Sequence, residues 1–386
     1  MSARKVAVLK GGRSLERNVS LRSGAHAQEA LERLGHDVVG LDVGPELVAQ
    51  LREERPDVAF IALHGRDGED GTVQTLLEAI GVPYTGSGPA ACMRCTDKVL
   101  AKYLMREANI PTPEFHSVRE AAIKELGAAD ALLDVEAALG FPLVVKPASQ
   151  GSALGVKFAR TGEELPRALV GAFSYDSKVL IERYVKGRDL AVSVLDGEGQ
   201  PLPGGERGAP RADGTAPVAL PVVEAVPREE DFYDYESRYE IGMTTFVCPA
   251  ELEAETTARA QQLALQVYAL LGCHGVARVD LMLDRDSGEL WVLETNVVPG
   301  MTETSLLPQA ADAAGIGFDE LIARVLASAW RRAPAPAAAP AIPRPAAKSS
   351  GETSSRNSLN FSTTSSDSST SCSNSIADSA ITSSAA

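Results

Sequence analysis

The chain has 386 residues, of which 44% are hydrophobic and 23% charged, and its net charge of −15 argues against a nucleic-acid-binding protein, which normally carries a basic face. This length exceeds what one hydrophobic core usually serves, so we expect two or three globular domains. No apolar run is long enough for a membrane span, no signal-peptide cleavage site is present, and five cysteines favour a reducing compartment, which predicts a cytoplasmic protein with no membrane partner.

The N-terminal segment begins with an apolar strand over 5–9, followed by Gly11, Gly12 and a helical pattern over 15–34. This order places backbone N–H groups at the N-terminus of a helix, where an anion binds well. Glu16 falls in the first turn of the predicted helix. It is either a favourable partner of the helix dipole or a residue at the mouth of a site that orients another side chain, and the local sequence leaves both interpretations open.

A second apolar strand over 57–63 runs into a loop over 64–71 that contains three glycines. Open α/β sheets bind ligands at the carboxyl ends of their strands, so this loop is a candidate ligand contact. His64 at its start either contacts a ligand as a proton donor or caps the loop, and its loop position favours the ligand contact. A helix over 72–80 and a strand over 82–84 continue the alternation of β and α, which predicts a parallel sheet.

The middle segment contains a loop of small residues between two predicted strands. The first strand covers 141–146, and the second covers 156–159. Small side chains between them allow backbone N–H groups to approach a phosphate, although a plain hairpin loop would have the same composition. Lys146 at the end of the first strand favours the phosphate interpretation, because a lysine there is a natural phosphate partner.

The stretch 275–301 reads as two β-strands joined by a turn, with polar residues at chosen places in apolar runs. In such a hairpin Asp280 can face Glu294, and Asn296 follows Glu294 on the same face because side chains alternate with period two. Arg278 joins that face by the same spacing. Two carboxylates and an amide oxygen suit Mg²⁺, and the alternative is a solvated hairpin face with an ion pair. The apolar flanks favour burial, and buried acids need a cation or a partner.

Taken in order, these segments closely resemble the D-alanine–D-alanine ligases of the ATP-grasp family over about Lys5 to Ala329. Any one of the motifs alone would be weak evidence, but their number and order are specific. The matching motifs are GGRSLERNVSLRSG, ALHGRDGEDGTVQ, PYTGSG, DKV, VVKPASQGSALGV, VLIERYV, FYDYESRY, RVDLMLD and LETNVVPGMTETSLLP.

The resemblance implies an α/β protein with the three-domain ATP-grasp fold. Residues 1–96 would form an N-terminal parallel α/β domain, residues 97–187 a central α+β domain, and residues 188–332 a C-terminal α+β domain, with ATP held between the last two. Residues 333–386 are rich first in Pro and Ala and then in Ser and Thr. Such a tail cannot bury a core and is predicted to be disordered.

The activity that the resemblance implies is the joining of two D-alanine molecules to D-alanyl-D-alanine for peptidoglycan synthesis. ATP would phosphorylate the carboxylate of the first D-alanine, and the amine of the second would attack the acyl phosphate. Two Mg²⁺ or Mn²⁺ ions and a homodimer are part of the same expectation. The alternatives are a ligase that takes D-lactate or D-serine as the second substrate, and a nucleotide-binding protein without catalytic activity.

The resemblance also assigns roles to individual residues. For the nucleotide, the matching residues are Lys98 and Lys146 at the phosphates, Glu182 and Val185 at the adenine, and Asp189 at the ribose. For the metal ions they are Asp280, Asn296 and a bridging Glu294. At the first D-alanine, Glu16 matches the residue that positions the ammonium group, Ser152 and Tyr239 form a hydrogen-bonded triad with Glu16, and His64 lies nearby. At the second D-alanine, Ser305 matches the contact to the carboxylate. Arg278 and the backbone N–H of Gly300 match the groups that stabilise the oxyanion.

The aromatic and charged stretch 232–239 is the candidate lid, because an acyl phosphate would hydrolyse if water entered the site. A surface turn with aromatic anchors is the alternative. The sequence departs from the family's pattern at several places, which include Val297-Val298, the long segment 197–219 and two single positions. Ala153 replaces the second serine of the phosphate loop, and Arg238 stands in the lid where the ligases carry lysine, which preserves the charge but changes its geometry.

Overall fold

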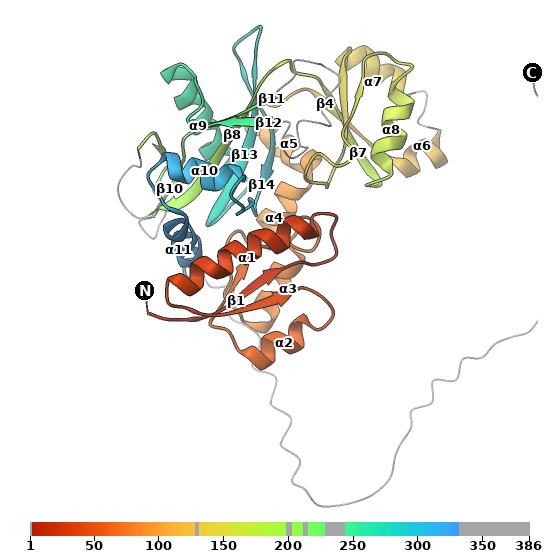
Figure 1. The fold of residues 1–386 in the computed structure, drawn as a ribbon. Coiled ribbons are helices and arrows are strands. Elements are labelled where there is room, and N and C mark those ends of the chain that lie inside the picture. Colours follow the sequence, from red (N-terminus) through yellow and green to blue (C-terminus); the bar gives the residue numbers. More distant parts are fainter. Residues whose placement is uncertain (1, 128–130, 198–202, 211–214, 228–243, 332–386) are drawn as a thin grey trace, which may run out of the picture. The chain divides into compact units, whose positions relative to one another are not determined.

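The computed structural model describes residues 2–127, 131–197, 203–210, 215–227 and 244–331 (Figure 1). The predictions for the lid over 232–239, which include Tyr239 and Arg238, lie outside these residues, as does the predicted disordered tail. Among the helices that the structure describes, none combines the length and the apolar character needed to cross a bilayer.

The N-terminal sheet has three parallel strands in the order β2-β1-β3, with α1 running beside β1 (Figure 1). Its elements are β1 (Lys5–Lys10), α1 (Arg17–Arg33), β2 (Asp37–Asp42), α2 (Leu47–Glu54), β3 (Val58–Ile61), α3 (Thr72–Ile80) and α4 (Pro89–Thr96). The predicted parallel sheet is confirmed. The strand predicted over 82–84 is wrong, because this segment makes only an isolated bridge between Ala59 and Tyr84. Pro83, the residue before Tyr84, has no N–H group that could extend the bridge into a ladder.

The middle of the chain forms a four-stranded antiparallel sheet in the order β4-β7-β5-β6. The elements of this part are α5 (Lys98–Glu107), β4 (Phe115–Arg119), α6 (Glu120–Leu126), α7 (Ala131–Leu139), β5 (Leu143–Pro147), β6 (Lys157–Ala159), α8 (Leu165–Phe173) and β7 (Lys178–Arg183). Alternate residues of β5 and β7, such as Leu143, Val145 and Ile181, pack against Leu165 and Leu169 of α8. This packing leaves the opposite face of the sheet to Lys146 and Glu182, since side chains alternate along a strand.

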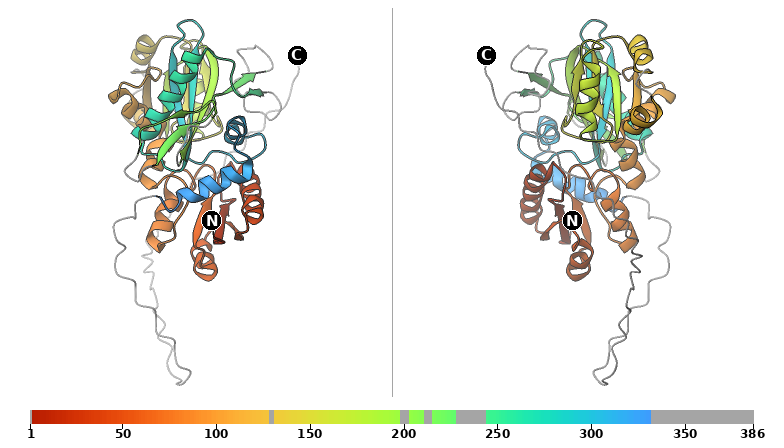
Figure 2. Two further views of the ribbon diagram at one scale, coloured as in Figure 1. Left: turned by 90° about the vertical axis from the view of Figure 1, so that its left-hand side faces the viewer. Right: turned by 90° about the vertical axis from the view of Figure 1, so that its right-hand side faces the viewer.

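The C-terminal sheet is built around the long strand β8, which pairs with β10, β11 and β13. Its elements are β8 (Gly187–Gly197), β9 (Glu206–Arg207), β10 (Ala216–Ala219), β11 (Val223–Pro227), β12 (Thr244–Val247), α9 (Ala254–Leu270), β13 (Val276–Asp284), β14 (Leu290–Asn296), α10 (Leu306–Ala313) and α11 (Phe318–Ser328). In Figure 2, α9 lies along one face of this sheet.

The two faces of the C-terminal sheet have different characters. Apolar residues such as Val192, Val279 and Leu281 pack in one cluster with α9 residues. Side chains alternate along a strand, so the intervening residues Asp189 and Asp280 project from the other face. Period-two alternation therefore separates a packed face from one that presents charged groups.

Candidate active site

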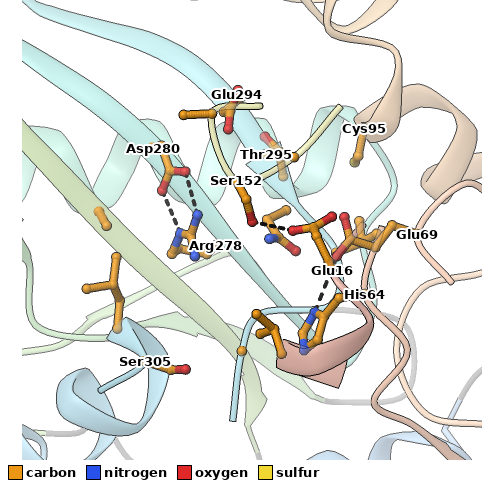
Figure 3. A pocket seen from close by; sticks show the side chains of 18 of the residues that line it. Glu16, His64, Glu69, Cys95, Ser152, Arg278, Asp280, Glu294, Thr295 and Ser305 are labelled. Carbon is orange, nitrogen blue, oxygen red and sulfur yellow. Dashed lines mark hydrogen bonds and ion pairs between the residues drawn. The ribbon is translucent and has the colours of Figure 1, made fainter. Parts of the chain in front are cut away.

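A cavity of about 260 Å³ opens among residues from the N-terminal, central and C-terminal sheets (Figure 3). Its lining includes residues that lie far apart in the sequence, from the loops after β1 and β3 to the loop before α10. The sequence-predicted residues that line it are Glu16, His64, Lys98, Ser152, Asp189, Arg278, Asp280, Glu294, Asn296, Gly300 and Ser305. The fold thus brings most of the predicted site residues to one place.

The predicted hairpin places its polar residues as expected. Asp280 on β13 lies directly opposite Glu294 on β14, and Arg278 lies opposite Asn296. The guanidinium of Arg278 donates from Nε and Nη2 to the two carboxylate oxygens of Asp280, both at 2.7 Å. The ion pair of the alternative interpretation therefore exists, but the face that carries it lines a cavity.

A β-bulge makes this arrangement possible. Leu281 pairs with Val292, whereas the next pair is Asp280 with Glu294, so Leu293 is an additional residue on β14. Val292 is fully buried in the cluster that includes α9 residues. With a regular ladder, Glu294 would project to the same face as Val292, because the two are two residues apart. The bulge re-aims Glu294 toward the cavity, a common use of bulges at functional sites.

Glu294 is held in its charged form by the cations around it. Its Oε2 atom lies 3.5 Å from Nζ of Lys98. Burial alone would raise the pKa of Glu294, but Lys98, Lys146 and Arg278 outweigh that effect and lower it. An ionised carboxylate is the form that binds a metal ion.

The donor set fits a divalent cation that arrives with phosphates. Among the residues that the structure describes, no group of three or more His, Cys, Asp and Glu side chains could hold a metal by itself. Mg²⁺ is commonly bound by one or two carboxylates together with substrate phosphates and water, rather than by a cage of protein ligands. Asp280 and Glu294 supply that number of carboxylates, and Asn296 adds an amide oxygen on the same face.

Glu16 bridges two loops at the rim of the cavity. It is the residue before the first turn of α1 and not part of that turn, so the prediction was one position out, and its side chain makes no capping hydrogen bond. Instead, Ser152 Oγ donates to Oε1 of Glu16. A Cβ atom at Gly65 would lie 2.5 Å from Oε2 of Glu16, so the glycine leaves room for the carboxylate in its present position. The contact with Ser152 favours the site interpretation over a simple dipole partner.

The carboxyl group of Glu16 is harder to ionise than that of an ordinary glutamate. Burial and the nearby charge of Glu69 raise its pKa. The hydrogen bond from Ser152 and the charges of His64 and Lys98 offset this rise only in part. A cation brought next to Glu16 would therefore find a carboxylate that lacks a strong positive partner.

His64 is buried beneath the same rim, with only 3% of its surface exposed. Its Nε2 atom lies 3.0 Å from Oγ of Ser23. Its Nδ1 atom lies 3.4 Å from Oε1 of Glu69, a contact that Figure 3 shows. Ser23 Oγ also accepts the backbone N–H of Met301 at 3.1 Å. Neither Ser23 nor Glu69 was assigned from the sequence. Glu69 lies in the glycine-rich loop already marked as a ligand contact, and Ser23 lies in the motif GGRSLERNVSLRSG, within which no pattern distinguishes it.

The predicted phosphate loop joins β5 to β6 and has an unusual backbone. Ser152 and Ala153 have φ angles of 50° and 53°, in the left-handed region that favours glycine. Lys98 Nζ donates to the carbonyl oxygen of Gln150 at 2.6 Å, which ties this loop to the first turn of α5. The loop is thus a hairpin loop with local strain, and such strain concentrates at functional sites.

Lys146 and Glu182 form a buried ion pair on neighbouring strands, with Nζ of Lys146 2.5 Å from Oε1 of Glu182. Together with the buried Val185, they do not line the described cavity. Lys102, for which the sequence predicted no role, lies 2.9 Å from Oε2 of Glu182. Burial would raise the pKa of Glu182, but the two lysines lower it. The signal that could have revealed Lys102 is its spacing of four residues from Lys98 on one helix.

Gly300 and Ser305 meet at the end of the cavity nearest α10. A Cβ atom at Gly300 would lie 2.6 Å from Oγ of Ser305, so the absence of a side chain permits this contact. Ser305 is the residue before α10, and its Oγ accepts the backbone N–H of Thr302 at 3.0 Å. The predicted pair is therefore adjacent, on a loop held by local hydrogen bonds.

Comparison with known proteins agrees with this geometry. Residues 104–327 match the family model described as D-ala D-ala ligase C-terminus, and residues 44–87 match D-ala D-ala ligase N-terminus. The D-alanine–D-alanine ligase of Synechococcus sp. (strain JA-3-3Ab) is 42% identical over 343 residues, covering 88% of this chain and 98% of that relative.

Solved structures of ligases have the same fold as this chain. The D-alanine–D-alanine ligase from Bacillus anthracis complexed with ATP superimposes with a TM-score of 0.68 at 32% identity, covering 85% of this chain and 98% of that one. The VanG D-Ala:D-Ser ligase from Enterococcus faecalis has a TM-score of 0.68 at 25% identity, covering 85% and 100%. The predicted ATP-grasp fold is thereby confirmed, and the chain belongs to the D-alanine–D-alanine ligase family.

Proposed function

We propose that this protein uses ATP to join two D-alanine molecules into D-alanyl-D-alanine, the dipeptide used in peptidoglycan synthesis. The observation that carries the proposal is the pair of Asp280 and Glu294, directly opposite each other on a face that lines a cavity shared with Lys98. Family membership supports the substrates, because a curated relative at 42% identity is a D-alanine–D-alanine ligase.

In the proposed reaction, the γ-phosphoryl group of ATP passes to the carboxylate of the first D-alanine. Lys98 and Lys146 would hold the phosphates, Glu182 and Val185 the adenine, and Asp189 the ribose. The amine of the second D-alanine then attacks the acyl phosphate and phosphate leaves. Arg278 and the backbone N–H of Gly300 would stabilise the oxyanion that forms at the attacked carbon, as preorganised donors do in a closed site.

Asp280, Glu294 and Asn296 would hold two Mg²⁺ or Mn²⁺ ions. When bound, these ions neutralise the charge that develops among the transferring phosphate oxygens. The ionised state of Glu294 supports this assignment, because its pKa is lowered before any metal is present.

Glu16 would receive the ammonium group of the first D-alanine, with Ser152 orienting the carboxylate and His64 beside it. Tyr239 would complete the hydrogen-bonded triad and Ser305 would contact the carboxylate of the second D-alanine.

Three features are carried over from the resemblance: the boundaries of three domains at 1–96, 97–187 and 188–332, a homodimer that light scattering would detect, and a cytoplasmic location that fractionation would test.

The pH dependence of D-alanine use tests the role of Glu16. Burial and the charge of Glu69 raise the pKa of Glu16. As the pH is lowered, the carboxylate of Glu16 should therefore become protonated at a higher pH than that of an ordinary glutamate. The ratio kcat/KM for D-alanine should decrease over the same pH range, because protonated Glu16 no longer attracts the ammonium group. Glu69→Gln should move this fall to lower pH, because it removes a charge that raises the pKa. An acid limb unmoved by Glu69→Gln would contradict the assignment.

The choice of second substrate is tested by a phosphate-release assay with D-alanine, D-serine and D-lactate, each supplied with a limiting amount of D-alanine as first substrate. We expect D-alanine to be preferred by at least about tenfold in kcat/KM, a difference of about 1.4 kcal/mol in transition-state binding. A clear preference for D-lactate or D-serine at neutral pH would show that the enzyme uses that compound as its second substrate. If none of these substrates gave phosphate release, the protein would be a nucleotide-binding protein without catalytic activity.

A further inference from the structure

We infer that Lys102 is a positioning residue of the nucleotide site, one that neutralises Glu182 so that Lys146 is available to a phosphate. This inference rests on the proposed function. Lys102 is the lysine one helical turn after Lys98 on α5, and it is completely buried. Its Nζ atom is enclosed by Glu182 and Thr112, so we infer that it acts through these neighbours and not by touching substrate.

The contacts of Lys102 join three parts of the fold. Its Nζ atom lies 2.9 Å from Oε2 of Glu182 on β7 and 2.5 Å from Oγ1 of Thr112. Thr112 Oγ1 donates in turn to the carbonyl oxygen of Val292 on β14, at 2.8 Å. Val292 lies two residues before Glu294, so Lys102 is linked both to the proposed adenine contact and to the strand that carries the proposed metal ligand.

Charge balance explains why a second lysine is needed at this place. In the structure, the carboxylate of Glu182 is shared, with Oε1 facing Lys146 and Oε2 facing Lys102. A buried carboxylate left without a cation is costly, so Glu182 holds on to whichever lysine remains. If Lys146 turns from Glu182 to a phosphate, Lys102 stays behind as the counter-ion. Without Lys102, the attraction of Glu182 would keep Lys146 away from the nucleotide.

The pKa of Lys102 reflects its burial within the protein. Burial lowers its pKa to about 8, although the charge of Glu182 opposes this effect. The amine of Lys146, in contrast, has a raised pKa, because Glu182 and Glu294 outweigh its burial. Of the two lysines, Lys146 is thus the more firmly charged and the better suited to a phosphate.

The test is Lys102→Met, assayed for the KM of ATP and the KM of D-alanine in the same phosphate-release experiment. We expect the KM of ATP to rise at least tenfold, while the KM of D-alanine changes less than threefold. Thr112→Val is the matched control, because it removes the two hydrogen bonds that link Lys102 through Thr112 to β14 but keeps the ion pair with Glu182. It should lower the urea midpoint of unfolding and leave the KM of ATP within threefold of wild type.

A double variant separates positioning from a purely structural role. In Lys102→Met with Glu182→Gln, the carboxylate that retains Lys146 is gone, so the increase in the KM of ATP should be at least fivefold smaller than the product of the two single increases. Strictly additive effects, or a Lys102→Met variant with the wild-type KM of ATP, would overturn the inference. If Lys102→Met does not fold, Lys102→Gln replaces it under the same criteria. An inactive wild-type protein would instead refute the proposed function.

Discussion

Replacing Glu294 with glutamine should lower the turnover of D-alanine and ATP by about 10³-fold, the effect of losing about 4 kcal/mol of stabilisation by metal ions. The variant keeps the size of the side chain but removes a charged oxygen that faces the cavity opposite Asp280. It should still bind nucleotide, because Lys98 loses a competing negative charge 3.5 Å away. Loss of turnover with retained nucleotide binding is the signature of a metal ligand.

The measurement is a titration of phosphate release with Mg²⁺, combined with calorimetric binding of ADP without metal. Glu289→Gln is the matched control, since Glu289 is exposed and lies just before the same strand. It should behave as wild type in both measurements. If Glu294→Gln turned over within tenfold of wild type at saturating Mg²⁺, the assignment of Glu294 would be wrong.

Replacing Arg278 with lysine should reduce kcat by about 10²-fold and leave the KM of ATP nearly unchanged. Removing one oxyanion donor typically costs about 10²–10³ in kcat. Lysine keeps the positive charge but lacks the planar fork of arginine. Here that fork donates from two nitrogens to the two oxygens of Asp280, so the single nitrogen of lysine cannot keep this planar pairing while it presents an N–H group in the same direction to a reacting oxygen.

The same phosphate-release assay measures this effect, with kcat and the KM of ATP determined separately. Arg285→Lys is the control, because Arg285 lies in the exposed turn between the same two strands. An Arg278→Lys variant with normal kcat and a raised KM of ATP would assign Arg278 to ground-state nucleotide binding instead of the oxyanion.

Several features followed from short stretches of sequence. The helix predicted over 72–80 matches α3 residue for residue, because an N-terminal glycine and Gly81 bound an amphipathic run. The alternation along β13 placed Arg278 and Asp280 on one face, and the structure confirms that they share it. Local periodicity and turn residues decide such features, so no distant contact is needed to predict them.

The pairing of Asp280 with Glu294 was predicted correctly, but its cause was not visible in the sequence. A regular hairpin would have turned Glu294 toward the same side as the buried Val292. The additional residue Leu293 reverses this direction. Whether a strand contains a bulge depends on what its two faces pack against, here α9 on one side and the cavity on the other.

The amino-acid sequence by itself determined the elements, the side chains that share a strand face, and, through the order of its motifs, the family. Only the tertiary structure decided which distant groups meet. Ser152 reaches Glu16 across 136 positions of the chain, and Ser23 joins His64 to the backbone of Met301. The physical reason is the range over which each effect acts. Strand alternation and helical spacing act over a few residues of the chain. The neutralisation of a buried charge such as Glu182 instead depends on side chains that are distant in the sequence, here Lys102 and Lys146.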